Sequence, residues 1–109
     1  MNISEYITES RGEPHLFGSD NEYVHYDTAQ RITCADGFSV SVQASKTHYC
    51  TPRSDIGPWT EFELGFPSRR EPLLVQYAEE PKRQTRTVYG YVPEAVVLAV
   101  IEKHGGVKE

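Results

Sequence analysis

The residues best suited to chemistry lie together in HYCTPRSDIGPW, residues 48–59. His48 and Cys50 would share one face of a strand, where they could form a thiolate–imidazole pair for nucleophilic catalysis. With His25 or Cys34 the pair could also bind zinc, but the chain has neither a CxxC nor an HxxxH spacing. We therefore predict no catalytic residue, no metal and no cofactor, and interpret Cys50 as a small buried hydrophobic residue.

The same stretch is better suited to binding. It belongs to a segment of fifteen residues, 45–59, which is long for a connection between neighbouring strands, and its prolines stiffen it. We predict an ordered binding loop, because aromatic and arginine side chains dominate interface hot spots. Its candidate binding residues are His48, Tyr49, Arg53 and Trp59. In the alternative, Tyr49 and Trp59 cap the sheet edge and Arg53 pairs with Asp55.

Length and charge limit the classes of protein that fit. A chain of 109 residues with 38% hydrophobic residues predicts a single domain, residues 1–109. The net charge of −5 comes from residues 1–30, an acidic and partly irregular segment with six acids against Arg11; residues 31–109 hold ten acids and ten bases. No basic stripe follows the chain, so we predict no direct nucleic-acid binding.

The predicted location is the cytoplasm. The longest apolar run, residues 95–101, is too short to cross a bilayer, and the first ten residues lack a signal segment. We therefore expect no membrane association. In that compartment Cys34 and Cys50 are expected to be free thiols.

Residues 31–44 carry the clearest structural signal, two β-rich runs around Ala35-Asp36-Gly37. A three-residue loop pairs Cys34 with Phe38 and puts the apolar residues on one face. Gly37 would then take the left-handed position of a bulge. The predicted buried residues are Ile32, Cys34, Phe38, Val40 and Val42, and the predicted outward residues are Thr33, Ser39, Ser41 and Gln43.

The rest of the chain completes a small α+β domain. TEFELGF predicts a strand with Phe62, Leu64 and Phe66 on one side, and PLLVQYA favours a helical turn. A strand at TVYGYV precedes a helix from Pro93 to Gly105. Residues 31–106 thus form a small antiparallel sheet with a C-terminal helix packed on one face. Before them, residues 2–10 predict a short helix, and EYVHY, residues 22–26, a possible strand.

The alternation in VYGYVP raises a separate question of which face is covered. On a regular strand Tyr89 and Tyr91 share one face, and Val88, Gly90 and Val92 share the other. We predict that the helix covers the valine face, with Gly90 leaving room for its close approach. Both tyrosines would then extend the aromatic surface of the 48–59 loop. The alternative is that the N-terminal segment buries both rings.

The run ADGFSVSVQAS, followed by HYCTPR, GPW, ELGFPS and YGYVPEAVVLAVIEKHGG, carries a resemblance. It resembles a family of small uncharacterised accessory proteins encoded by tailed bacteriophages and prophages, over residues 31–106. The resemblance implies a non-virion protein acting inside an infected bacterium. Such proteins modulate host machinery or neutralise host defences by binding a host protein or a small signal molecule.

Two hypotheses about function follow. In the first, the protein is a non-enzymatic inhibitor that binds a host protein through the 48–59 loop and neighbouring aromatics. In the alternative, it sequesters a nucleotide-like ligand, or is a small enzyme acting on one: Arg53 or Arg86 would grip phosphate, and Trp59 or Tyr91 would stack on the base. The oligomeric state is open, a homodimer included.

Overall fold

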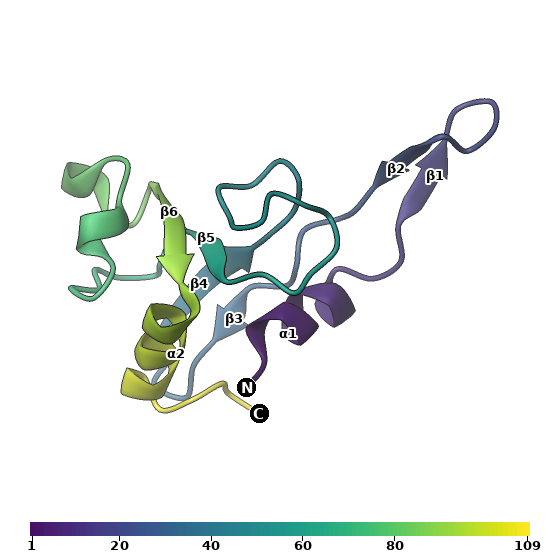
Figure 1. The fold of residues 1–109 in the computed structure, drawn as a ribbon. Coiled ribbons are helices and arrows are strands. Elements are labelled where there is room, and N and C mark those ends of the chain that lie inside the picture. Colours follow the sequence, from purple (N-terminus) through teal and green to yellow (C-terminus); the bar gives the residue numbers. More distant parts are fainter.

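The computed structural model describes residues 1–109, and its main element is a four-stranded antiparallel sheet of order β3-β4-β5-β6 (Figure 1). The strands span Ile32–Thr33 (β3), Ser39–Gln43 (β4), Glu61–Gly65 (β5) and Val88–Pro93 (β6). Helix α2, Glu94–Lys103, follows β6 directly and shares the strands' hydrophobic core. The predicted fold class is therefore confirmed: α+β, with an antiparallel sheet and a C-terminal helix.

The β3–β4 hairpin forms as the apolar pattern predicts. Ile32 lies opposite Val40, and the backbone N–H of Cys34 donates to the carbonyl of Phe38 at 2.7 Å. Gly37 has a φ of +93°, which a glycine adopts without steric cost. All five residues of the predicted inner face are buried: Ile32, Cys34, Phe38, Val40 and Val42.

The outward position predicted for Gln43 is wrong, because its side chain is only 7% exposed. The Gln43 amide NH₂ donates to the carbonyl of Ala29 at 2.9 Å, and its oxygen accepts from the Ala29 N–H at 2.7 Å. A buried amide needs such partners, and here the backbone of the preceding segment supplies both. Gln43 thus fixes that segment against the sheet.

Strand β5 is one residue shorter than its alternation suggests. Phe62 and Leu64 are buried, but Phe66 is 51% exposed, so its predicted inner position is wrong. Phe66 has a φ of +52°, a conformation that few non-glycine residues adopt. The strand ends at Gly65. The left-handed backbone conformation of Phe66 then turns its own ring outward.

Residues 66–87 connect β5 to β6, and residues 68–87 of this connection form a lobe at one end of the molecule (Figure 1). The helical turn predicted for residues 72–78 is confirmed as the 3₁₀-helix η1, Val75–Tyr77, and a second one, η2, spans Pro81–Arg83. Leu74 is fully buried and anchors the lobe to the core. After β6, Pro93 caps α2 from the last position of the strand, so the predicted helix start is wrong by one residue.

The predicted N-terminal helix is present as α1, Ile3–Ser10. The side-chain oxygen of Asn2 accepts the backbone N–H of Glu5 at 3.0 Å, which caps the first turn. Ile3 and Ile7 are buried in the core, so α1 covers part of it from the side of the acidic segment.

After α1 the chain leaves the body of the protein as a two-stranded antiparallel hairpin, β1 (His15–Phe17) and β2 (Tyr23–His25). The strand expected in EYVHY is thus present as β2. Figure 1 shows this hairpin projecting from the body, at the opposite end from the lobe, and every residue of both strands is exposed. We call residues 13–27 the arm.

Candidate functional site

Three tyrosines from distant parts of the sequence meet beside β6. Tyr49, Tyr77 and Tyr91, with Glu79 and Gly90, line a shallow recess of about 280 Å³, which we call the tyrosine surface. The rings of Tyr49 and Tyr91 are 39% and 43% exposed, with centroids 6.1 Å apart and planes inclined by 39°. Arg53 extends the surface, because its guanidinium carbon lies 5.7 Å from the centre of the Tyr49 ring.

A break in the register of β6 creates this surface. Leu64 pairs with Tyr89 but Phe62 pairs with Val92, so β6 contains an extra residue opposite β5. Tyr91 lies in the extra segment with a φ of +53°, and its ring turns to the outside. Its backbone N–H donates to the carbonyl of Tyr49 at 3.0 Å, which holds the two tyrosines side by side.

The prediction that Tyr89 and Tyr91 share one face of the strand is wrong because of this bulge. Tyr89 is 1% exposed, its hydroxyl donates to the carbonyl of Gln84, and burial raises its pKa. Tyr89 is therefore a core residue. Gly90 makes room for Tyr49 instead of the helix, because a Cβ there would lie 3.3 Å from the Tyr49 Cβ.

Trp59 also belongs to the core. It is 1% exposed, and its indole N–H donates to the carbonyl of Ser54 at 2.9 Å. The hydroxyl of Ser4 in α1 accepts the backbone N–H of Trp59 at 3.0 Å. The burial of Trp59 leaves its ring unavailable to a partner: its indole N–H bonds within the 48–59 loop, and its backbone N–H joins the loop to α1.

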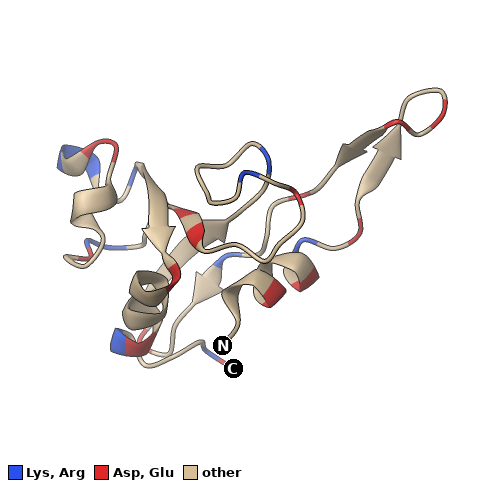
Figure 2. Cartoon of the chain, in the orientation of Figure 1, with Lys and Arg blue, Asp and Glu red and all other residues tan.

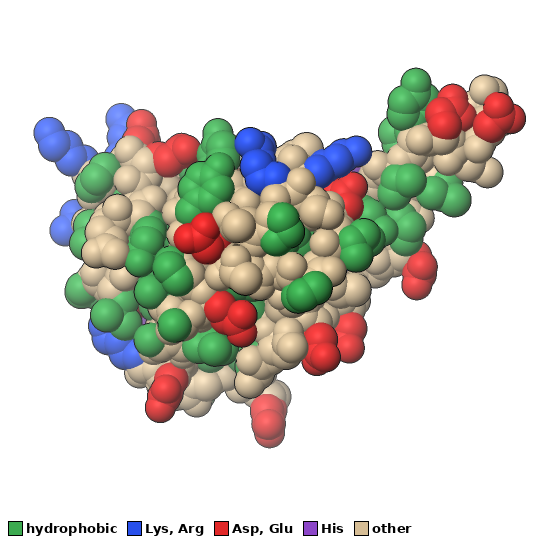
Figure 3. All heavy atoms as spheres, viewed as in Figure 1, with side chains coloured by type: hydrophobic (Ala, Val, Ile, Leu, Met, Phe, Trp, Pro, Cys, Tyr) green, Lys and Arg blue, Asp and Glu red, His purple; other side chains and the backbone are tan.

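The remaining candidates of the loop differ in accessibility. His48 is half-buried, with Nδ1 2.7 Å from the hydroxyl of Ser45. Arg53 is exposed and lies over Tyr49, so the alternative pairing with Asp55 is wrong; Asp55 lies 3.9 Å from the ammonium of Lys46. Figure 3 shows basic side chains and hydrophobic side chains close together on this face of the molecule.

Cys50 does not fit a nucleophile. Its side chain is 1% exposed, and its thiol donates to the carbonyl of Ser45 at 3.1 Å. Burial raises the pKa of the Cys50 thiol, which disfavours the reactive thiolate. Cys34 is likewise a free, fully buried thiol with a raised pKa, and no group of three His, Cys, Asp or Glu side chains is arranged to hold a metal ion.

Arg86 lies apart from the tyrosines, in a recess of about 350 Å³ in the lobe. No acidic residue lines this recess, and Arg86 and the three other cations that line it form no ion pair within 4 Å; these are Arg70, Lys82 and Arg83. Figure 2 shows basic and acidic residues side by side at this end of the molecule, whereas the arm carries acidic residues alone. Because none of the tyrosines lines the recess, Arg86 and Tyr91 belong to different sites.

Sequence reasoning missed a buried charged cluster next to α2. His104, which caps that helix, lies 2.7 Å from Asp36 through Nδ1 and 2.7 Å from Glu71 through Nε2, and its ring stacks on Phe38 at 4.1 Å. The two ring nitrogens of His104 therefore lie between two carboxylates from distant parts of the chain, and the Arg69 guanidinium lies 3.3 Å from Nδ1 as well. Lys103 adds a contact with Glu71 at 3.0 Å.

The charges in this cluster lower the pKa of both carboxyls. The backbone N–H of Phe38 and the side chain of His104 hold the pKa of Asp36 below its ordinary value. Burial acts to raise the pKa of Glu71, but the N–H of Leu73 and the side chains of Lys103 and His104 outweigh it, so that pKa is lowered as well. The cluster therefore stabilises the junction of α2, the β3–β4 turn and the lobe.

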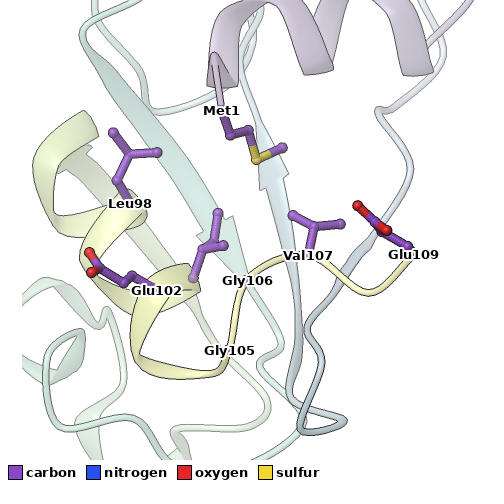
Figure 4. A pocket seen from close by; sticks show the side chains of 8 residues that line it. Met1, Leu98, Glu102, Gly105, Gly106, Val107 and Glu109 are labelled. Carbon is purple, nitrogen blue, oxygen red and sulfur yellow. The ribbon is translucent and has the colours of Figure 1, made fainter.

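A larger groove, of about 830 Å³, lies between the C-terminal half of α2 and the chain termini. Figure 4 shows Leu98 and Glu102 on the helix facing Met1 and Val107 across it. The groove is open and contains apolar side chains with a carboxylate on each side, Glu102 and Glu109. None of its residues was among the predicted site residues, and its lining has no lysine, arginine, histidine or cysteine side chain.

The fold and its surfaces place the chain among small α+β proteins with an exposed aromatic recess and a projecting hairpin. Comparison with protein-family models, with curated proteins and with solved structures finds no match. No helix has the length and apolarity needed to cross a bilayer.

Proposed function

We propose that the protein is a non-enzymatic accessory protein that binds and inhibits another protein through the tyrosine surface. The observation that carries the proposal is the meeting of the exposed rings of Tyr49 and Tyr91, 6.1 Å apart, with Tyr91 held at a φ of +53°. Such a backbone conformation costs about 1 kcal/mol or more, and strained residues of this kind concentrate at functional sites. Here the strain presents a ring to the outside instead of burying it.

The composition of the surface supports a protein partner. Exposed tyrosine with adjacent arginine is the combination enriched at binding hot spots, and it gives a large contact area with few rotatable bonds. Tyr49 is restrained as well, since its backbone N–H donates to the carboxylate of Glu63 at 3.1 Å and its carbonyl accepts from Tyr91. A surface whose backbone is already held in place loses little backbone entropy on association.

The setting proposed for this activity is the cytoplasm of a bacterium infected by a tailed phage, and the partner is a host protein, defence systems included. This part of the proposal rests on the sequence resemblance over residues 31–106. The buried, protonated thiol of Cys50 favours binding over nucleophilic catalysis.

The test compares capture of host protein by the wild type and by Tyr91→Asn. Asparagine tolerates the left-handed conformation, so this variant removes the ring and keeps the backbone. Phe66→Ser is the matched control, because it removes another exposed ring at a positive φ that lies outside the tyrosine surface. We expect the wild type and the control to capture a host protein in a stoichiometric amount. Capture by Tyr91→Asn should be at least about tenfold weaker. Equal capture by all three proteins contradicts the proposal.

The nucleotide-like alternative keeps one specific arrangement in its favour, Arg53 beside Tyr49 and Tyr91. Two of its proposed ligand-binding residues do not fit, because Trp59 is buried and Arg86 lines a different recess. A thermal-shift screen against nucleotides tests it, since a ligand at 100 times its dissociation constant adds about 2.7 kcal/mol of stability. A shift that Arg53→Ala abolishes would favour this alternative over a protein partner.

A further inference from the structure

The arm exposes several large apolar side chains that no other part of the chain covers. Leu16, Phe17 and Tyr23 are 54–56% exposed and Val24 is 38% exposed. Figure 3 shows hydrophobic side chains along the projecting arm. A two-stranded hairpin with no third strand or helix against it is marginally stable in water, so this one is suited to a second surface that covers it.

The two faces of the arm have different chemistry. Phe17 and Tyr23 are paired across the strands and stack at 5.4 Å, and on the same face His15 pairs with His25. Leu16 lies opposite Val24 on the other face, which is purely aliphatic. Each face therefore presents a cross-strand pair of large side chains to a partner.

The arm is also acidic throughout. It contains four carboxylates and no lysine or arginine; these are Glu13, Asp20, Glu22 and Asp27. Only one of them forms an ion pair, Asp27 with His15 at 3.0 Å. A surface that covers the arm must therefore combine apolar contacts with free positive charge.

The lobe of this same protein has that combination. Its recess is lined by four cations without an ion-pair partner, which outnumber the two unpaired carboxylates of the lobe, Glu79 and Glu80. The lobe also exposes Leu73 and Val75, at 44% and 37%. Arm and lobe lie at opposite ends of a molecule whose longest dimension is 47 Å (Figures 1 and 2). The arm therefore cannot reach the lobe of its own chain, whereas it can reach that of a second copy.

We propose that two copies of this chain associate by packing the acidic, apolar arm of each against the basic lobe of the other. In a two-fold dimer the contact forms twice, which closes the assembly. The tyrosine surface contributes no residue to the arm or to the cationic recess, although its Tyr77 and Glu79 belong to the lobe. The dimer is tested separately from the host partner, because the variants that test it leave Tyr49, Tyr77 and Tyr91 unchanged.

The experiment measures self-association of the purified protein by sedimentation at several concentrations and at low and high salt. We expect a dimer whose dissociation constant rises with ionic strength, because free charges form part of the contact. Replacing Phe17 and Tyr23 with serine should weaken the dimer by at least about 30-fold. Ile56→Ser is the matched control; Ile56 is 62% exposed, lies outside arm and lobe, and should leave association unchanged.

Charge reversal identifies the two surfaces that meet. We expect an arm variant, Glu13→Lys with Asp20→Lys, and a lobe variant, Arg83→Glu with Arg86→Glu, each to be monomeric alone. Mixed in equal amounts, the two variants should form a heterodimer, since both of its arm–lobe contacts again join opposite charges. None of these four side chains forms a hydrogen bond or ion pair within the protein, so folding should persist, which thermal unfolding checks. A monomeric wild type at all concentrations, or no rescue on mixing, overturns the proposal.

Discussion

Replacing His104 with alanine should produce a large loss of stability from a single polar residue. The His104 ring is 8% exposed and its Nε2 lies 2.7 Å from Glu71, whose side chain is 1% exposed. Removing the partner of a buried, ionised carboxylate costs about 3–5 kcal/mol, because that charge then remains buried without its partner. Glu71 keeps Lys103 and the N–H of Leu73, so we expect the lower end of this range, about 3 kcal/mol.

The assay is urea unfolding at neutral pH followed by tryptophan fluorescence. Trp59 is the single tryptophan and is 1% exposed, so its emission reports the loss of the core. The control is Lys103→Met, which removes the other charged partner of Glu71 from a side chain that is 46% exposed. An exposed pair contributes less than about 1 kcal/mol. If His104→Ala and Lys103→Met cost the same, the His104 ring is not the group that stabilises Glu71, and the reasoning fails.

Two further predictions concern acid and thiols. Folding lowers the pKa values of Asp36 and Glu71, so these two carboxylates stabilise the fold fully at pH values above their unfolded-state pKa values, near 4. This stabilisation is lost as the pH falls through their folded-state pKa values. The urea midpoint should therefore drop steeply below about pH 4 in the wild type and less in Glu71→Gln. Cys34 and Cys50, both buried with raised pKa, should react with a thiol reagent only at the rate of unfolding, and fast reaction of either in native buffer would contradict this.

The elements with a regular period could be predicted from the sequence. The β3–β4 hairpin was predictable because one residue more or less in the loop moves the whole apolar set to the other face, and only the three-residue loop buries Cys34 with Phe38. Helix α2 was predictable from its aliphatic stripe and the preceding proline. Both predictions rest on local spacing, which the final structure preserves.

The missed features depend on contacts between residues far apart in the sequence. His104 meets Asp36 across 68 positions and Glu71 across 33, and no local pattern links them. Trp59 lies in the core, and its backbone N–H bonds to Ser4, 55 positions away. The arm did have a local signal, since HLF and YVH flank GSDNE, a turn-rich segment of five residues, but no helix or third strand reinforces it.

The tyrosine surface was predicted in part, but the structure forms it through a bulge in β6 and not through regular alternation. Tyr49, Arg53 and Tyr91 are accessible as expected, whereas Trp59 and Tyr89 are buried. Strict alternation in β6 cannot separate Tyr89 from Tyr91, because side chains two positions apart on a regular strand point to the same face. The bulge adds one residue to the count and separates the two rings.

Gly90 provides the last prediction, since it lies beside that bulge. Its φ is not positive, so alanine fits the backbone and should gain about 0.4–1 kcal/mol through the unfolded state. The new Cβ would lie 3.3 Å from the Cβ of Tyr49, which must move by a few tenths of an ångström. Because the Tyr49 ring is 39% exposed, it can move, and we expect Gly90→Ala to change the free energy of unfolding by less than about 1 kcal/mol while it weakens partner capture. A loss above about 2 kcal/mol would mean that Tyr49 is fixed by the core, and the tyrosine surface would then be structural.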